Sequence, residues 1–212
     1  MSFEISYSFY LVCLVDICAD AGNSLAKVLQ DEFGKENVMF AKCDVTSDKE
    51  FEDAYNACEK QMGTVSILCN NAGVLAKDYR TTMDTNFGSV VRGTELALKR
   101  MGKHNGGEGG FIVNTASVLG AERFPFTPMY CASKAAIIHY TRCMGHEFHY
   151  EYSGVHILSV CPCAVDTPSS RPREVAEVFL QAIEEHKPGA ALAIKYGLKP
   201  FYVTPSLLTE YS

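Results

Sequence analysis

The stretch LVCLVD, residues 11–16, has the pattern of a short buried β-strand that ends in a carboxylate. Residues 23–33 follow with apolar side chains at helical spacing, and Gly34 ends this run. A second β-like run, VMFAKCDV at residues 38–45, again ends near an acid, Asp44. The sequence therefore alternates strand, helix and strand from its first apolar run onward.

This alternation continues along the rest of the chain. SDKE at residues 47–50 has the capping-box spacing that begins a helix, and VSILC at residues 65–69 is typical of a short strand. The periodicity predicts helices over residues 82–103, 128–152 and 173–186, and strands over residues 111–114, 155–160 and within 190–203. Such an alternation predicts an α/β fold, with a mostly parallel sheet covered by helices on both faces.

Length and composition indicate one domain, residues 1–212, that binds neither nucleic acid nor membranes. The 212 residues, 47% of them hydrophobic, are enough for a single well-packed core. A formal charge of −6 and a pI near 5.5 argue against a surface for nucleic acid or anionic lipid. No apolar run approaches the roughly 20 residues that a membrane span needs.

The cysteines and the first residues favour a cytoplasmic location. Nine cysteines, an odd number scattered through apolar stretches, suit reduced and packed thiols better than a disulfide framework. The first apolar run follows no positive charge, carries Glu4 just before it and is interrupted by Asp16. A secretory signal is therefore the less favoured alternative.

Three polar residues in NTASVLGAERFPFTPMYCASK, residues 114–134, form a candidate catalytic group. Tyr130 and Lys134 are four residues apart on a predicted helix, so they share one face. An ammonium beside a phenol stabilises the phenolate and lowers its pKa from about 10 toward that of a general base. Ser117 follows the preceding strand, where its hydroxyl can face the same cleft. Alone, the pair also fits a solvated tyrosine and a surface lysine.

Six motifs in a fixed order give this group its context. They are CDVTSDKEF, LCNNAGV, MDTNFGSVVRGT, IVNTASVLG, YCASKAA and VCPCAVDT. Together, over about residues 11–167, they resemble the classical short-chain dehydrogenase/reductases (SDRs), in particular the 15-hydroxyprostaglandin dehydrogenase-like branch with its insect alcohol dehydrogenase-like members. The resemblance implies a Rossmann-like, doubly wound sheet.

The resemblance also implies catalytic roles. Tyr130 would be the acid/base that accepts the alcohol proton while hydride leaves for the nicotinamide. Ser117 would hydrogen-bond the substrate oxygen. Lys134 would lower the pKa of the tyrosine and bind the nicotinamide ribose. Asn86 would hold a water in the proton relay to this lysine, although alone it also fits a polar helix residue facing solvent.

For the cofactor, the resemblance implies NAD in preference to NADP. Asp16 would bind the adenosine ribose hydroxyls, where its carboxylate repels a 2′-phosphate, and Ile17 follows in place of an arginine. Asp44 and Val45 would contact the adenine.

The remaining cofactor contacts fall on two later stretches. The adenine ribose is assigned to Asn71, Ala72 and Gly73, and the nicotinamide carboxamide to Val165 and Thr167. Gly73 suits its place because the backbone must pass close to the dinucleotide. Cys163 stands where the family usually has glycine, so its β-carbon is expected to press on the nicotinamide or shift the loop.

The family's first strand, TGxxxGxG turn and following helix have no counterpart in the sequence. That turn and helix provide the N–H groups and the dipole that bind the pyrophosphate. We therefore expect an N-terminally truncated sheet with exposed edges or rearranged pairing, and weakened NAD binding. NGGEGG at residues 105–110 is no substitute, because it follows a helix and precedes a strand.

Two functions stay open from the sequence. The first is an NAD-dependent oxidoreductase that interconverts a secondary alcohol and a ketone on an apolar small molecule. The second is a catalytically impaired or non-catalytic variant or fragment of such an enzyme, acting as a binding or partner subunit. By resemblance, the helices at residues 82–103 and 128–152 would form a homodimer or homotetramer.

The other signals are weaker. HEFH at residues 146–149 lacks the HExxH spacing and CPC at residues 161–163 has no second ligand pair, so no metal site is predicted. Residues 168–212 form the expected substrate-loop and C-terminal region. Four aromatic residues fit either an apolar substrate pocket or simple core packing: Phe124, Phe126, Phe201 and Tyr202.

Overall fold

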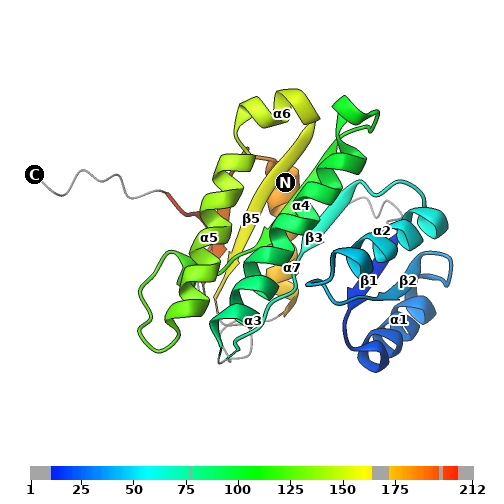
Figure 1. Cartoon of the computed structure of the whole chain (residues 1–212), viewed down its shortest axis with the longest axis horizontal. Coiled ribbons are helices and arrows are strands. Elements are labelled where there is room, and N and C mark those ends of the chain that lie inside the picture. Colours follow the sequence, from blue (N-terminus) through cyan, green and yellow to red (C-terminus); the bar gives the residue numbers. More distant parts are fainter. Residues whose placement is uncertain (1–10, 77, 164–171, 196–197, 205–212) are drawn as a thin grey trace, which may run out of the picture. The chain divides into compact units, whose positions relative to one another are not determined.

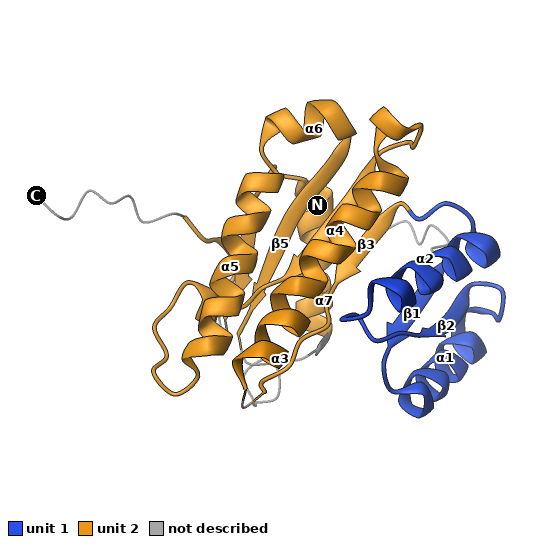
Figure 2. Cartoon of the chain, in the orientation of Figure 1, with its two compact units in different colours: residues 1–65 blue, residues 66–212 orange. Residues whose placement is uncertain are grey.

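A computed structural model describes residues 11–76, 78–163, 172–195 and 198–204 (Figure 1). The chain divides into two compact units, Met1–Val65 and Ser66–Ser212, which are coloured separately in Figure 2. Each unit is described by itself. That all 212 residues form one domain stays a prediction.

Unit 1 is a two-stranded parallel sheet between two helices. Its elements are β1 (Val12–Asp16), α1 (Ala19–Phe33), β2 (Val38–Lys42) and α2 (Asp48–Met62). Gly22 of α1 lies against the ring of Phe40, so closely that an added β-carbon would be 2.0 Å from it. On the other face, Cys58 of α2 lies close enough to Cys13 of β1 to raise the pKa of its thiol. Because neighbouring strand positions point to opposite faces, α1 and α2 cover the two sides of this sheet.

The predicted start of α2 at Ser47 is confirmed. Ser47 is the N-cap residue, and its side chain accepts a hydrogen bond from the backbone N–H of Glu50 at 3.3 Å, which satisfies a donor that a helix N-terminus otherwise leaves open. The Glu50 carboxylate accepts from the backbone N–H of Asp44 at 3.0 Å, and the Ser47 N–H donates to the Asp44 carbonyl oxygen, so only half of the capping box is formed.

Unit 2 contains a five-stranded sheet in the order β3-β4-β5-β6-β7. The strands are β3 (Ile67–Asn70), β4 (Gly110–Thr115), β5 (Val155–Pro162), β6 (Ala191–Ile194) and β7 (Phe201–Tyr202). The first four are parallel and β7 is antiparallel, so the single strand predicted within residues 190–203 is in fact two. Among the described residues, β1 and β3 each pair along one edge only.

Two of the long helices predicted for unit 2 are interrupted in the structure. They are α3 (Tyr79–Met83), a π-helical turn (Asp84–Gly88), α4 (Ser89–Met101), α5 (Pro128–Met144), α6 (Glu147–Ser153) and α7 (Pro172–Glu185), with 3-10 turns at Lys103–Asn105 and Val118–Gly120. The helix predicted over residues 82–103 begins earlier and contains the π turn. The helix predicted over residues 128–152 ends at Gly145, where a β-carbon would lie 2.4 Å from the Ile157 carbonyl oxygen.

The core of unit 2 fills both faces of its sheet. Ile112 and Ile157 pack against α4, whereas Val113 and Leu158 pack against α7. Helices α4 and α5 therefore cover one face and α7 the other, as Figure 1 shows. The parallel strands β3, β4 and β5 bring their carboxyl ends to the same edge, which is where the candidate site lies.

No helix in the described part of the chain combines the length and the low polarity that crossing a membrane requires.

Candidate active site

Tyr130 and Ser117 meet just beyond the carboxyl end of β4. Tyr130 lies in the first turn of α5 and is half-buried. The Ser117 hydroxyl is buried and lies close enough to the Tyr130 hydroxyl to affect the pKa of the phenol. It donates a hydrogen bond to the Pro162 carbonyl oxygen at 3.3 Å. Its oxygen accepts from the Leu119 N–H at 3.2 Å.

Lys134 lies one helical turn after Tyr130 and is almost fully buried, with 3% of its surface exposed. Its ammonium donates a hydrogen bond to the Thr115 carbonyl oxygen at 2.8 Å and lies 5.7 Å from the centre of the Tyr130 ring. Burial lowers the pKa of Lys134 from its usual 10.5 to about 8. The amine therefore titrates near pH 8, close to neutral pH.

The predicted lowering of the Tyr130 pKa is not seen in this structure. Burial raises the pKa of Tyr130 above its usual value, and the hydrogen bond from Ser117 only partly offsets this. Lys134 contributes little because its ammonium is held by the Thr115 carbonyl oxygen instead of the phenol oxygen. A phenolate at Tyr130 thus needs further stabilisation that the chain alone does not supply.

Asn86 lies in the π-helical turn and is completely buried, which excludes the solvent-facing alternative. Its Oδ1 accepts from the Val74 N–H at 2.7 Å, and its Nδ2 donates to the Val74 carbonyl oxygen at 3.0 Å. Nδ2 also donates to the Ser133 hydroxyl at 3.0 Å. Asn86 therefore ties the loop after β3 to the helix that carries Tyr130 and Lys134.

We expect Asn86→Ala to lower the free energy of unfolding by about 1–3 kcal/mol, because it leaves buried partners without a hydrogen bond. Urea denaturation of the variant and the wild type measures the difference. Asn105→Ala is the control, because Asn105 is exposed and its side chain bonds only the neighbouring His104 among the described contacts. Equal midpoints for the Asn86 variant and the wild type would contradict the expectation.

Gly73 lies beside Lys134 and Asn86. A β-carbon on Gly73 would be 3.4 Å from the Lys134 ammonium and 3.5 Å from the Asn86 Oδ1. Asn71 and Ala72 are exposed, and the Asn71 side-chain oxygen accepts from the Thr115 hydroxyl at 2.9 Å. The structure thus gathers Asn71, Gly73, Asn86 and Lys134 around one place at the carboxyl edge of the sheet.

A buried amide network that the sequence patterns did not predict lies next to this place. Asn70 and Asn114 are opposite one another at the ends of β3 and β4, and the Asn70 Nδ2 donates to the Asn114 Oδ1 at 2.9 Å. The Asn114 Nδ2 donates in turn to the Thr141 hydroxyl at 3.0 Å. In the sequence, asparagine is the last residue of β3 and the second-last of β4, which was the available signal. The network fixes the strand ends from which Asn71 and Ser117 follow.

Four of the predicted adenosine contacts, Asp16, Ile17, Asp44 and Val45, lie in unit 1. Asp16 ends β1 and is exposed, and its Oδ1 accepts from the Cys18 N–H at 2.8 Å. Ile17 beside it is 59% exposed. The Asp44 carboxylate accepts from both the N–H and the hydroxyl of Thr46, at 2.9 and 2.7 Å, so it closes a local turn. Val45, within that turn, is half-buried.

The predicted carboxamide contacts, Val165 and Thr167, lie outside the described residues. Cys163, just before them, is described. Its backbone N–H donates to the Ile194 carbonyl oxygen at 3.0 Å, and its side chain packs beside the core under α5.

The four aromatic residues suggested for a substrate pocket or core packing have different surroundings. Phe124 and Phe126 stack edge to face at 5.4 Å, and Phe126 is 83% exposed. Tyr202 donates a hydrogen bond from its hydroxyl to Glu185 and packs against the core beside α7, whereas Phe201 is 40% exposed.

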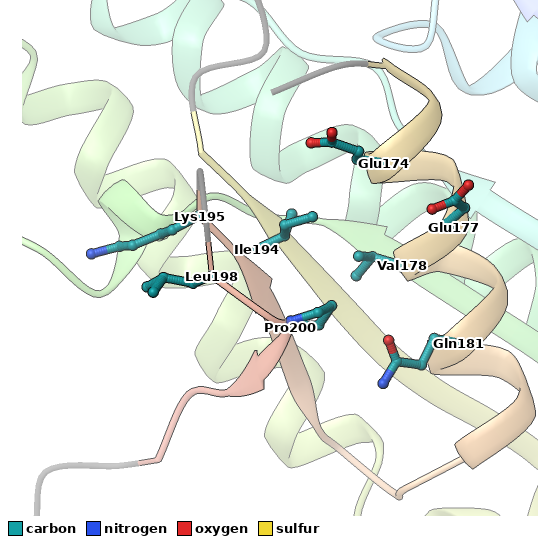
Figure 3. A pocket seen from close by; sticks show the side chains of 8 residues that line it. All are labelled: Glu174, Glu177, Val178, Gln181, Ile194, Lys195, Leu198 and Pro200. Carbon is teal, nitrogen blue, oxygen red and sulfur yellow. The ribbon is translucent and has the colours of Figure 1, made fainter. Parts of the chain in front are cut away.

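A hollow of about 380 Å³ lies elsewhere, between α7 and the ends of β6 and β7 (Figure 3). Its lining includes the Glu174 and Glu177 carboxylates, Lys195 and the apolar Leu198. None of the candidate catalytic residues lines it. The candidate active site is therefore not this hollow but the group of residues around Tyr130.

A family profile described as short chain dehydrogenase matches residues 5–177. The chain belongs to the short-chain dehydrogenase family. It is thereby one of a family of oxidoreductases that act on CH–OH groups. The predicted α/β, Rossmann-like fold is confirmed by a solved short chain dehydrogenase from Mycobacterium smegmatis, which is 25% identical, with a TM-score of 0.76 over 89% of this chain and 82% of that one.

Two curated relatives support the predicted branch of the family. The 15-hydroxyprostaglandin dehydrogenase [NAD(+)] of Mus musculus is 37% identical over 188 residues, which are 88% of this chain and 70% of the relative. Alcohol dehydrogenase 1 of Ceratitis capitata is 36% identical over 143 residues, 67% of this chain and 56% of the relative. Both kinds of relative had been expected from the motifs.

Proposed function

We propose that the chain is an NAD-dependent oxidoreductase that interconverts a secondary alcohol and a ketone on an apolar small molecule. The observation that carries this proposal is the meeting of Ser117, Tyr130 and Lys134 at the carboxyl edge of the sheet, with Asn86 buried behind them. The mouse relative is named for a hydroxyprostaglandin, which supports an alcohol on an apolar molecule.

In this proposal the two hydroxyls of Tyr130 and Ser117 bind the substrate oxygen. Ser117 can turn its proton from the Pro162 carbonyl oxygen to the substrate, which positions the carbinol for reaction. Tyr130 then accepts the alcohol proton as the carbon loses its hydride. In the reverse direction Tyr130 donates this proton to the carbonyl oxygen. NAD, when bound, accepts the hydride.

The residues around Gly73 fit the ribose of such a cofactor. An ammonium has three donors, and the described bond of Lys134 to Thr115 uses one of them. The other two can donate to ribose hydroxyls beside Gly73, where the absence of a side chain lets a ligand approach. A positive charge held there also supports the Tyr130 phenolate.

Asp16 is proposed to set the preference for NAD over NADP. We expect Asp16→Ala to weaken NAD binding about 10-fold or more, because charge-assisted hydrogen bonds to two ribose hydroxyls are lost. The same change removes repulsion of a 2′-phosphate, so the NAD-to-NADP affinity ratio should fall. Calorimetric titration of both nucleotides into each protein measures this ratio. Asp20→Ala is the matched control, since Asp20 is an exposed acid on α1.

An unchanged ratio in the Asp16 variant would contradict this assignment. The same titration tests the second candidate function, a catalytically impaired binding subunit. A folded wild-type chain that does not bind NAD would support that candidate.

We further propose a cytoplasmic homodimer or homotetramer, assembled through the helices that contain α4 and α5. The proposal rests on the family and on the arrangement of these two helices on one face of the sheet. Light scattering coupled to size exclusion gives the mass of the assembly. A monomer at micromolar concentration would contradict it.

A further inference from the structure

The ends of β3 and β4 carry two side-chain hydrogen bonds, one after the other. Asn70 and Asn114 are register partners, and the Asn70 Nδ2 donates to the Asn114 Oδ1 at 2.9 Å. One residue further along each segment, the Thr115 hydroxyl donates to the Asn71 Oδ1 at 2.9 Å. Neighbouring strand positions point to opposite faces, and the Asn114 side chain bonds Thr141 of α5. The Thr115 side chain therefore points to the face opposite α5.

Burial separates the roles of these two bonds. Asn70 and Asn114 are 7% and 0% exposed, so a ligand cannot reach their side chains. Thr115 is half-buried and Asn71 is exposed. The first bond therefore only joins the strands, whereas the second lies where a ligand at the carboxyl edge of the sheet can meet it.

The Asn71 amide keeps its donors while Thr115 holds its oxygen. A side-chain amide has two N–H donors on its nitrogen and an acceptor oxygen. The Thr115 hydroxyl bonds the oxygen, and no residue in the described part of the chain bonds the Asn71 Nδ2. The torsion of an asparagine amide about its last side-chain bond is otherwise broadly distributed. The bond to Thr115 therefore fixes the direction in which the two N–H groups of Asn71 point.

The same residue holds Lys134 through a different atom. The Thr115 backbone carbonyl oxygen accepts from the Lys134 ammonium at 2.8 Å. This ammonium lies 3.4 Å from the place that a β-carbon on Gly73 would take. Thr115 thus bonds two groups assigned to the cofactor, one by its hydroxyl and one by its carbonyl oxygen. A change of its side chain alters only the bond to Asn71, since the carbonyl belongs to the backbone.

We propose that Thr115 is a positioning residue for the cofactor, and that its hydroxyl orients the Asn71 amide to donate to a ribose hydroxyl of NAD. The inference rests on the proposed function, because NAD is the ligand that it requires. Thr115 acts through Asn71 and does not touch the reacting atoms. It therefore contributes to the affinity for NAD and not to the transfer of the proton or the hydride.

Calorimetric titration of NAD into the whole chain tests the proposal. Thr115→Val removes the hydroxyl but keeps the shape of the side chain. We expect it to raise the Kd for NAD about 2- to 10-fold, the effect of one lost hydrogen bond. Thr115→Ser keeps the hydroxyl and should bind NAD as tightly as the wild type. Thr64→Val, at an exposed residue before β3, is the matched control and should also leave the Kd unchanged.

Kinetic constants separate positioning from a general loss of structure. In Thr115→Val the KM for NAD should rise, while kcat at saturating NAD changes little because Lys134 keeps its carbonyl partner. A fall in kcat together with a fall in the urea midpoint would mean damage to the fold, and would contradict the positioning role.

A double-mutant cycle with Asn71→Ala decides whether Thr115 acts through Asn71. Asn71→Ala should weaken NAD binding, and adding Thr115→Val should cause no further loss, since both changes remove the same interaction. Additive losses, or equal Kd values for Thr115→Val and the wild type, would overturn the inference alone. A folded wild-type chain that does not bind NAD would overturn the proposed function and the inference with it. Should Thr115→Val fail to fold, Asn71→Ala takes its place, and an unchanged Kd for NAD would then overturn the inference.

Discussion

Replacing Tyr130 by phenylalanine is expected to lower kcat/KM about 10²–10⁴-fold, the usual contribution of a positioned acid or base. The change removes only the phenolic hydroxyl, which lies near the Ser117 hydroxyl. The ring keeps its place in the first turn of α5, so the fold should be retained. The proton of the alcohol then has no acceptor within reach as hydride is lost.

NADH formation with a panel of apolar secondary alcohols, and its loss with the matching ketones, measures this effect. Tyr152→Phe is the matched control, since Tyr152 is 64% exposed and stacks on His104 through its ring. It should leave activity unchanged. Activity of the Tyr130 variant within a few-fold of the wild type would contradict the assigned role, and a chain that binds NAD but turns over no member of the panel would contradict the proposed reaction.

The elements that the sequence predicted well are those with local signals. The strands around Ile112 and Ile157 come from continuous apolar runs, and the start of α2 comes from the capping box at Ser47. The break at Gly145 has no such signal. It depends on close packing against Gly189 and the Ile157 carbonyl, residues far away in the sequence. Contacts of this kind are tertiary, so periodicity alone extends the helix.

The features of the candidate site likewise fall into those that the sequence shows directly and those that depend on tertiary packing. Tyr130 and Lys134 share a helix face because they are four residues apart, which the sequence shows directly. The burial of Asn86 depends on hydrogen bonds to Val74, on a loop twelve residues earlier, and to Ser133. The raised pKa of Tyr130 likewise depends on how deeply the phenol is packed. The identity of the site residues is local information, whereas their electrostatics are set by tertiary packing.

Replacing Lys134 by methionine is expected to remove a pH dependence of stability. Burial lowers the pKa of Lys134 from its usual 10.5 to about 8, so the folded chain releases this proton before the unfolded chain does. Between these two values the unfolded state binds more protons, and the free energy of unfolding therefore rises with pH. Below pH 8 both states are protonated and the slope contributed by Lys134 vanishes.

The difference in unfolding free energy between the wild type and Lys134→Met should therefore shift in favour of the wild type by up to about 3 kcal/mol from pH 7.5 to 10.5. Buried phenols act in the opposite direction, because burial raises the pKa of Tyr140 to about 12. Tyr140 is present in both proteins, so subtraction cancels its contribution. Urea denaturation across this range measures the difference, with Lys99→Met, on an exposed position of α4, as the control. Parallel curves for the wild type and the Lys134 variant would mean that Lys134 keeps its proton in the folded chain, and that its bond to the Thr115 carbonyl oxygen outweighs the cost of burial.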